Sequence, residues 1–130
     1  FSLTYKDTSG NDVKLDKFKG KKIIFSFWGT WCGECLIELK QLNELKKIDM
    51  FDTEVILVSD EPIEKITRFM QRKKYPFTFL QFNRPFSEIH VNAFPTNYLI
   101  NSRGEVTYSK VGAINWKDNS VISFAKENLK

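Results

Sequence analysis

Residues 23–28 form a near-continuous run of apolar strand formers, interrupted only by Ser26. Such a run is typical of a strand buried on both faces, as in the middle of a parallel sheet. The spacing of apolar residues then changes to that of a helix, which continues to about Lys47. The residues on its inner face are Cys35, Leu36, Leu39, Leu42 and Leu45. A buried strand that leads directly into a helix indicates an α/β fold.

The rest of the chain continues this alternation. Strands are predicted over residues 54–59, 77–82, 97–100 and 106–111, and helices from Asp60, over 85–90 and from Val121 to Leu129. Asp60 and Glu61 are interpreted as charges at the start of their helix, whose inner face is predicted to be Ile63, Ile66 and Met70. Alternating residues at 1–5 and 13–15 flank a turn and predict an N-terminal β-hairpin. We therefore expect a central mixed β-sheet flanked by helices on both faces.

Composition limits the classes of protein that this chain can be. With 130 residues, 42% of them apolar, it is expected to form a single domain over residues 1–130 with a real core. No apolar run approaches the roughly 18 residues that a membrane span needs. The net charge of +4 is spread over many lysines, which argues against a nucleic-acid reader and favours mildly acidic partners.

The two cysteines of the chain, Cys32 and Cys35, lie at the predicted start of the first helix. Two intervening residues allow both sulfurs to share the first helical turn, where backbone N–H groups and the helix dipole stabilise a thiolate. In such places thiol pKa values fall from about 8.5 to roughly 3.5–7.5. We expect Cys32 to attack and Cys35 to resolve the mixed disulfide, so that the pair cycles between dithiol and disulfide.

Two other interpretations of the cysteine pair remain open. It could be half of a zinc site, although the chain has one histidine and no third cysteine to complete four ligands. It could also be an inert structural disulfide, but closing a two-residue loop restrains little of the unfolded chain. His90 is interpreted as a helix-end residue without chemistry, and Trp28 as a core aromatic.

The chain resembles the thioredoxin superfamily and, within it, the TlpA/ResA-type thiol–disulfide oxidoreductases. The resemblance covers almost the whole chain, from the N-terminal hairpin through 18-FKGKK-22, 28-WGTWC-32, Glu38, 58-VSDE-61, 93-AFPT-96, 98-YLINSRG-104 and 111-VG-112. It implies a thioredoxin fold and a protein exported or tethered outside the cytoplasm. It also implies reduction of disulfide-containing protein substrates, often in cytochrome c maturation, with electrons from a membrane thiol reductase. No metal or cofactor is expected beyond the Cys32–Cys35 disulfide, and the protein is expected to be a monomer.

The resemblance also assigns residues to the site. It implies that Pro95 is cis and lies against the cysteine pair, where the backbone around Phe94 would pair with a substrate strand. Trp31, with Gly33 and Glu34 between the cysteines, is expected to contact substrate. The family pattern places an acid at Glu38, which we assign to proton transfer because burial raises the pKa of a carboxyl group.

Three positions depart from related patterns. Ser26 stands where thioredoxins carry an aspartate, which favours the TlpA/ResA branch. Lys40 replaces the usual family proline, which makes the helix kink expected from that proline doubtful. Glu34 replaces the proline of thioredoxins, and its charge is expected to destabilise a Cys32 thiolate and make the protein more reducing.

Other functions remain as alternatives. The chain could be a redox-inactive module that binds a peptide in the groove beside Pro95. A cytosolic thioredoxin-like reductase is disfavoured by Ser26 and by the N-terminal hairpin, and a thiol peroxidase by the sequence around its cysteines. The chain begins at Phe1 without an initiator methionine, so either a leader was removed or the end was trimmed, and the former favours export.

Overall fold

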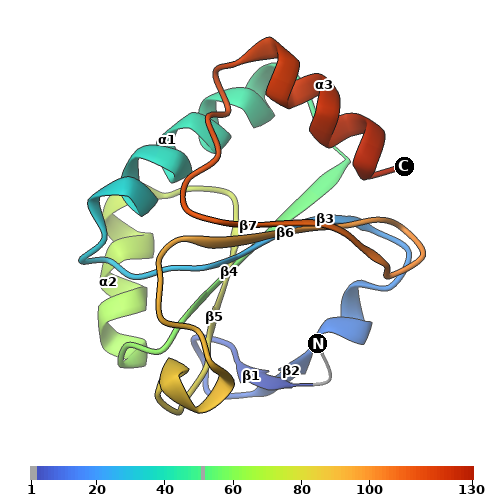
Figure 1. Cartoon of the computed structure of the whole chain (residues 1–130). Helices are drawn as coiled ribbons and strands as arrows, with labels where there is room; N and C mark the ends of the chain where they lie inside the picture. Colours follow the sequence, from blue (N-terminus) through green and yellow to red (C-terminus); the bar gives the residue numbers. More distant parts are fainter. Residues whose placement is uncertain (1–2, 51) are drawn as a thin grey trace.

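The computed structural model describes residues 3–50 and 52–130. Seven strands form one sheet in the order β2-β1-β5-β4-β3-β6-β7 (Figure 1). The strands are β1 (Thr4–Lys6), β2 (Asp12–Lys14), β3 (Lys22–Phe27), β4 (Thr53–Ser59), β5 (Thr78–Gln81), β6 (Thr96–Ile100) and β7 (Val106–Val111). The helices are α1 (Gly33–Ile48), α2 (Ile63–Lys73), α3 (Asn119–Asn128) and two 3-10 helices, η1 (Leu15–Phe18) and η2 (Phe86–Ile89).

The centre of the sheet is the parallel trio β5, β4 and β3, and β3 is the apolar run that the sequence singles out. On its other side β3 pairs with β6 in antiparallel orientation, and β6 pairs with β7 in the same way. The hairpin β1–β2 joins the far edge through an antiparallel contact with β5. The predicted mixed sheet with an N-terminal hairpin is therefore confirmed.

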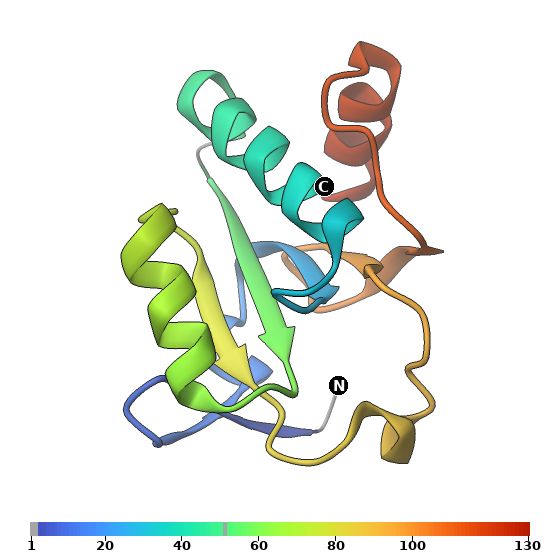
Figure 2. The same ribbon diagram turned by 90° about the vertical axis from the view of Figure 1, so that its left-hand side faces the viewer.

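The three α-helices lie on one face of the sheet (Figures 1 and 2). Parallel connections are almost always right-handed, and the connections β3–α1–β4 and β4–α2–β5 both step in the same direction, so α1 and α2 emerge on the same side. Residues from all three helices pack into one core cluster that includes Leu42, Phe69 and Ala125. This cluster holds the cysteine pair.

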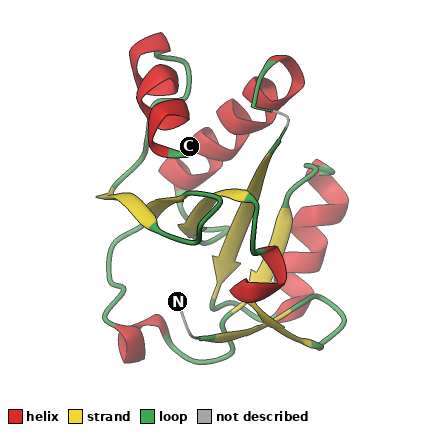
Figure 3. Ribbon diagram, turned by 90° about the vertical axis from the view of Figure 1, so that its right-hand side faces the viewer, coloured by secondary structure: helices red, strands yellow, loops and turns green. Residues whose placement is uncertain are grey.

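The opposite face is covered by short elements. The hairpin, η1 and η2 contribute Tyr5, Phe18 and Phe86 to a second core, which packs against Phe25 and Phe27 of β3. Figure 3 shows these helical turns on the side of the sheet away from α1 and α3. Both faces are thus flanked by helical elements, as expected, but the long helices occupy only one of them.

Several local details differ from the predictions. Leu15 begins η1 instead of continuing the hairpin strand, which ends at Lys14. On α2 the buried residues are Ile66 and Phe69, whereas Ile63 and Met70 are only half-buried. The part of the hairpin prediction that falls on residues 1–2 lies outside the described residues. Within the described chain, no helix combines the length and the apolar character required to cross a bilayer.

Candidate active site

The cysteine pair lies at the start of α1, where β3 passes into the helix. Cys32 is the N-cap of α1, and the backbone N–H of Cys35 donates to Cys32 Sγ at 3.2 Å. The two residues form a disulfide, with their Cα atoms 5.2 Å apart. In the reduced protein the same N–H and the positive end of the helix dipole would stabilise a Cys32 thiolate.

The two sulfurs are not equally accessible. Cys32 retains 6% exposure and Cys35 only 1%. Gly33 and Glu34 are exposed between them, and Trp31 is 63% exposed immediately before them. In the oxidised form the pair is thus buried but lies directly beneath an open surface.

The Phe94–Pro95 peptide bond is cis, as the resemblance implies. Phe27 at the end of β3 pairs with Thr96 at the start of β6. The chain segments around Cys32 and Pro95 therefore meet where these two strands end and begin. The rings of Trp31 and Phe94 touch edge to face, with centroids 5.3 Å apart. The structure therefore brings these predicted substrate-contacting residues together.

The backbone around Pro95 is partly engaged. The carbonyl oxygen of Pro95 accepts from Gly112 N at 2.7 Å, and that of Ala93 accepts from Thr96 Oγ1 at 2.6 Å. Within residues 3–50 and 52–130 no hydrogen bond to the N–H or C=O of Phe94 is found. These two groups of Phe94 are the ones that can pair with an added strand.

Glu38 lies one turn after Cys35 and is 3% exposed. Its Oε2 accepts from Ile114 N at 2.8 Å and from Asn97 Nδ2 at 3.2 Å. Burial raises the pKa of this carboxyl group from 4.5 to about 7, and the two donors and the charge of Lys110 oppose that rise only in part. A group with such a pKa can both take and return a proton near neutral pH.

Asn97 is a member of the site that sequence reasoning missed. It is fully buried on β6, and its Nδ2 donates both to Glu38 and to the carbonyl oxygen of Gly112, the latter at 3.1 Å. The Gly112 carbonyl fixes the orientation of the amide, so that an N–H faces the carboxylate. An asparagine within an otherwise apolar strand was the available signal, because asparagine is depleted in strands.

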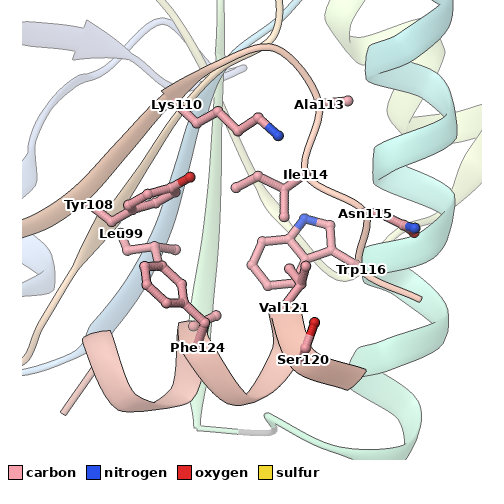
Figure 4. Close-up of a pocket in the computed structure, with 11 residues that line it drawn as sticks. Leu99, Tyr108, Lys110, Ala113, Ile114, Asn115, Trp116, Ser120, Val121 and Phe124 are labelled. Atoms are coloured by element: carbon pink, nitrogen blue, oxygen red, sulfur yellow. The ribbon is translucent and has the colours of Figure 1, made fainter. Parts of the chain in front are cut away.

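Two cavities border the loop that donates to Glu38. A small one, of about 140 Å³, is lined by Glu38 itself together with Ile37, Gln41 and residues 113–115. A larger one, of about 530 Å³, lies between β7 and α3, where Tyr108, Lys110, Trp116 and Phe124 surround it (Figure 4). The smaller cavity gives Glu38 a path to solvent that does not cross the disulfide.

Glu61 lies in a different place from the one predicted for it. It is 7% exposed and does not cap α2; its carboxylate accepts from Thr30 N at 2.8 Å, from Thr30 Oγ1 at 2.6 Å and from Ser59 Oγ at 2.7 Å. Asp60 likewise points away from the helix and accepts from Phe86 N at 3.1 Å. The interpretation of both as helix-start charges is therefore wrong. The carboxylate of Glu61 binds the loop before Cys32, and that of Asp60 binds the backbone of Phe86.

Replacing Thr30 by Val is expected to destabilise the protein by about 1–3 kcal/mol, because the hydroxyl donor to a nearly buried carboxylate is lost. Urea unfolding of the two proteins measures the difference. Thr67→Val on α2, whose hydroxyl has no hydrogen bond to a carboxylate within the described residues, is the matched control and should change stability by much less. Equal losses in the two variants would show that the Thr30–Glu61 contact contributes little.

The remaining predicted residues have structural places. Trp28 is a core residue, as predicted, and the centroid of its ring lies 4.9 Å from that of Phe69. His90 is the C-cap of η2, which agrees with its interpretation as a helix-end residue. Ser26 is buried in β3, and α1 runs through Lys40 without interruption. Across the described ranges no group of three histidine, cysteine or carboxylate side chains is placed to hold a metal ion.

Comparison with known proteins agrees with this geometry. The Redoxin family model matches residues 1–124. A thiol-disulfide oxidoreductase ResA from Geobacillus kaustophilus is 30% identical over 122 residues, which cover 91% of this chain and 69% of that protein. The sporulation thiol-disulfide oxidoreductase A of Bacillus subtilis is 29% identical over 114 residues, with 82% and 68% covered.

Solved structures share the fold of this chain. A provisionally named thiol:disulfide interchange protein DsbE from Chlorobium tepidum superposes with a TM-score of 0.80 at 21% identity, over 98% of this chain and 93% of that one. The chain spans between 60% and 69% of the length of the curated relatives that it matches. The superposition on the Chlorobium tepidum protein shows that this chain has a thioredoxin-like fold along nearly its whole length.

Proposed function

Since this chain belongs to the Redoxin family and is a thiol–disulfide oxidoreductase, we propose that it reduces the disulfides of exported proteins. Cys32 is the attacking thiol, Cys35 the resolving thiol and Glu38 the group that handles the proton. The observation that carries this proposal is the place of Cys32 at the N-cap of α1, where the Cys35 N–H donates to its sulfur. That contact favours a thiolate at Cys32 and thus a nucleophile.

The reaction takes two exchanges. The Cys32 thiolate attacks one sulfur of the substrate disulfide, the substrate S–S bond breaks, and one substrate sulfur leaves as a thiolate. Cys35 then loses its proton and attacks the Cys32 sulfur, which releases the second substrate thiolate and forms the Cys32–Cys35 disulfide. Two electrons pass from the protein to the substrate, and the protons given up by the two cysteines balance those taken up by the substrate thiolates.

The environment of Glu38 supports its role in the second exchange. A carboxyl group with a pKa of about 7 is partly ionised near neutral pH, so it can accept a proton from Cys35 one helical turn away. The small cavity beside it provides the route by which that proton reaches solvent.

Substrate binds across the exposed surface around Cys32. Phe94 provides the free backbone groups next to the cis Pro95, and its ring forms an apolar surface with Trp31. Gly33 leaves room for the approaching chain, since a side chain there would meet open space. Glu34 lies on the same surface and adds a negative charge.

The setting of the reaction is proposed from the relatives. Their names include ResA, which is consistent with reduction of disulfides in cytochrome c maturation outside the cytoplasm. The electrons are proposed to come from a thiol reductase in the membrane, which converts the Cys32–Cys35 disulfide back to the dithiol. We propose that the chain acts as a monomeric, single domain.

Measuring the reduction potential tests the direction of electron flow. A reductase is expected to lie nearer the thioredoxin value of about −270 mV than the DsbA value of about −120 mV. Glu34→Gln is expected to raise the potential by tens of millivolts, because it removes a charge that disfavours the thiolate. Glu44→Gln, an exposed change on the same helix, is the control and should leave the potential unchanged. A wild-type potential close to −120 mV would instead make the protein an oxidant.

A further inference from the structure

Three basic side chains of α2 form a stripe beside the loop that precedes Cys32. Lys65, Arg68 and Arg72 are spaced by three and four residues, which places them on one face of the helix. Together with Thr30 and Phe69 they line a surface cavity of about 150 Å³. We refer to Lys65, Arg68 and Arg72 as the α2 stripe.

The basic groups of the α2 stripe are not paired with acids of the described chain. Within residues 3–50 and 52–130 none of its three side chains forms an ion pair, whereas Lys22 and Lys126 pair with aspartates elsewhere. The guanidinium carbon of Arg72 lies 5.6 Å from the centroid of the buried Phe69 ring, which holds that side chain against the helix. Neither Glu64, the one acid of α2, nor Glu61, whose carboxylate accepts from Thr30, lines the cavity.

The position of the α2 stripe ties it to the cysteine pair. Thr30 lines the cavity and lies two residues before Cys32, and its backbone and hydroxyl groups are held by Glu61. An extended chain advances about 3.3–3.6 Å per residue. A few residues of a polypeptide whose cysteine is joined to Cys32 therefore suffice to reach the stripe.

We propose that the α2 stripe binds an acidic segment of the substrate polypeptide, a few residues from the cysteine that Cys32 attacks. This inference rests on the proposed function and adds a preference among substrates. Charge complementarity is its basis: three cations that form no ion pair within the described chain favour carboxylates and accelerate encounter with them. Glu34, exposed between the cysteines, repels acidic residues there, so the acidic segment is expected on the α2 side.

Two disulfide-bonded model peptides test the proposal. They share the cysteine and its immediate neighbours, and one carries aspartate and glutamate where the other carries asparagine and glutamine, at positions two to five residues away. At low ionic strength we expect kcat/KM to be roughly tenfold higher for the acidic peptide, and high salt should abolish the advantage. The triple variant Lys65→Gln/Arg68→Gln/Arg72→Gln should lose the advantage while it reduces the neutral peptide at an unchanged rate.

The matched control removes the same charge elsewhere. Lys14→Gln/Lys19→Gln/Lys117→Gln takes three exposed lysines from other surfaces and should keep most of the preference. Equal rates for the two peptides, or an equal loss in both triple variants, would overturn the inference. Failure to reduce the neutral peptide would instead overturn the proposed function. Binding of phosphatidylserine vesicles that depends on the α2 stripe, without any peptide preference, would assign the stripe to a membrane surface and would also overturn the proposal.

Discussion

Cys32→Ser is expected to reduce disulfide exchange to the background rate of the chemical reductant alone. Cys35→Ser is expected to behave differently, because Cys32 can still attack but nothing resolves the mixed disulfide. That variant should accumulate a covalent adduct with a disulfide substrate, which is visible by mass spectrometry and disappears on reduction. The exposures of 6% for Cys32 and 1% for Cys35 underlie this order of roles.

Circular dichroism provides the control for both cysteine variants, since a loop of two residues between the cysteines restrains little of the unfolded chain and both proteins should fold. Adducts formed by Cys32→Ser but not by Cys35→Ser would reverse the assignment. Peptide binding that persists unchanged in Cys32→Ser, with no exchange activity in the wild type, would favour the redox-inactive peptide-binding module.

The free energy of unfolding of the oxidised protein is expected to fall by about 3 kcal/mol between about pH 4.5 and pH 8 because of Glu38 alone. Burial raises the pKa of Glu38 from 4.5 to about 7 in the folded protein. Between these values the folded state keeps a proton that the unfolded state releases, so the contribution of Glu38 to stability is fully present at low pH and is lost as pH rises. Above the folded pKa both states are ionised and the loss is complete.

Glu38→Gln tests this expectation. The glutamine keeps an oxygen that can accept from Asn97 and Ile114 but does not titrate. Urea unfolding at several pH values should show that the variant lacks the roughly 3 kcal/mol decline, which makes it more stable than the wild type near pH 8. Glu44→Gln should retain the decline. A pH dependence of the same size in wild type and Glu38→Gln would refute the raised pKa of Glu38.

The parts of the molecule that the sequence predicts are those encoded locally. The apolar run of β3, the helical spacing after Cys32 and the position of the cysteines each depend on a few neighbouring residues. The distribution of the α-helices depends in addition on the spatial order β5-β4-β3, because right-handed crossovers place α1 and α2 on one face only when both connections step in the same direction. The periodicity of apolar residues does not reveal the spatial order of the strands. It therefore predicted helices on both faces without showing that the three α-helices share one face.

The contacts that complete the site could not be predicted in this way. Asn97 donates to Glu38 from 59 positions away, and Thr30 meets Glu61 across 31 positions. In the sequence, Glu61 stands just before a predicted helix, where an acidic residue is expected to interact with the helix N-terminus. Only the folded chain shows that its carboxylate binds the loop before Cys32 instead. Polar residues whose partners lie on other elements have no signature in the local pattern.

The parallel arrangement of β3 and β4 has a consequence for how this protein can diversify. The chain leaves both strands at the same end of the sheet, so α1 begins just after Cys32, and the segment that leads into α2 contacts the loop before Cys32 through Glu61 and Thr30. If the α2 stripe binds an acidic segment of the substrate, as we propose, surface changes along α2 alter the choice of substrate while the Cys32–Cys35 pair keeps its chemistry. Selection can then change the part of recognition that lies on α2 without changing the cysteine pair at the start of α1.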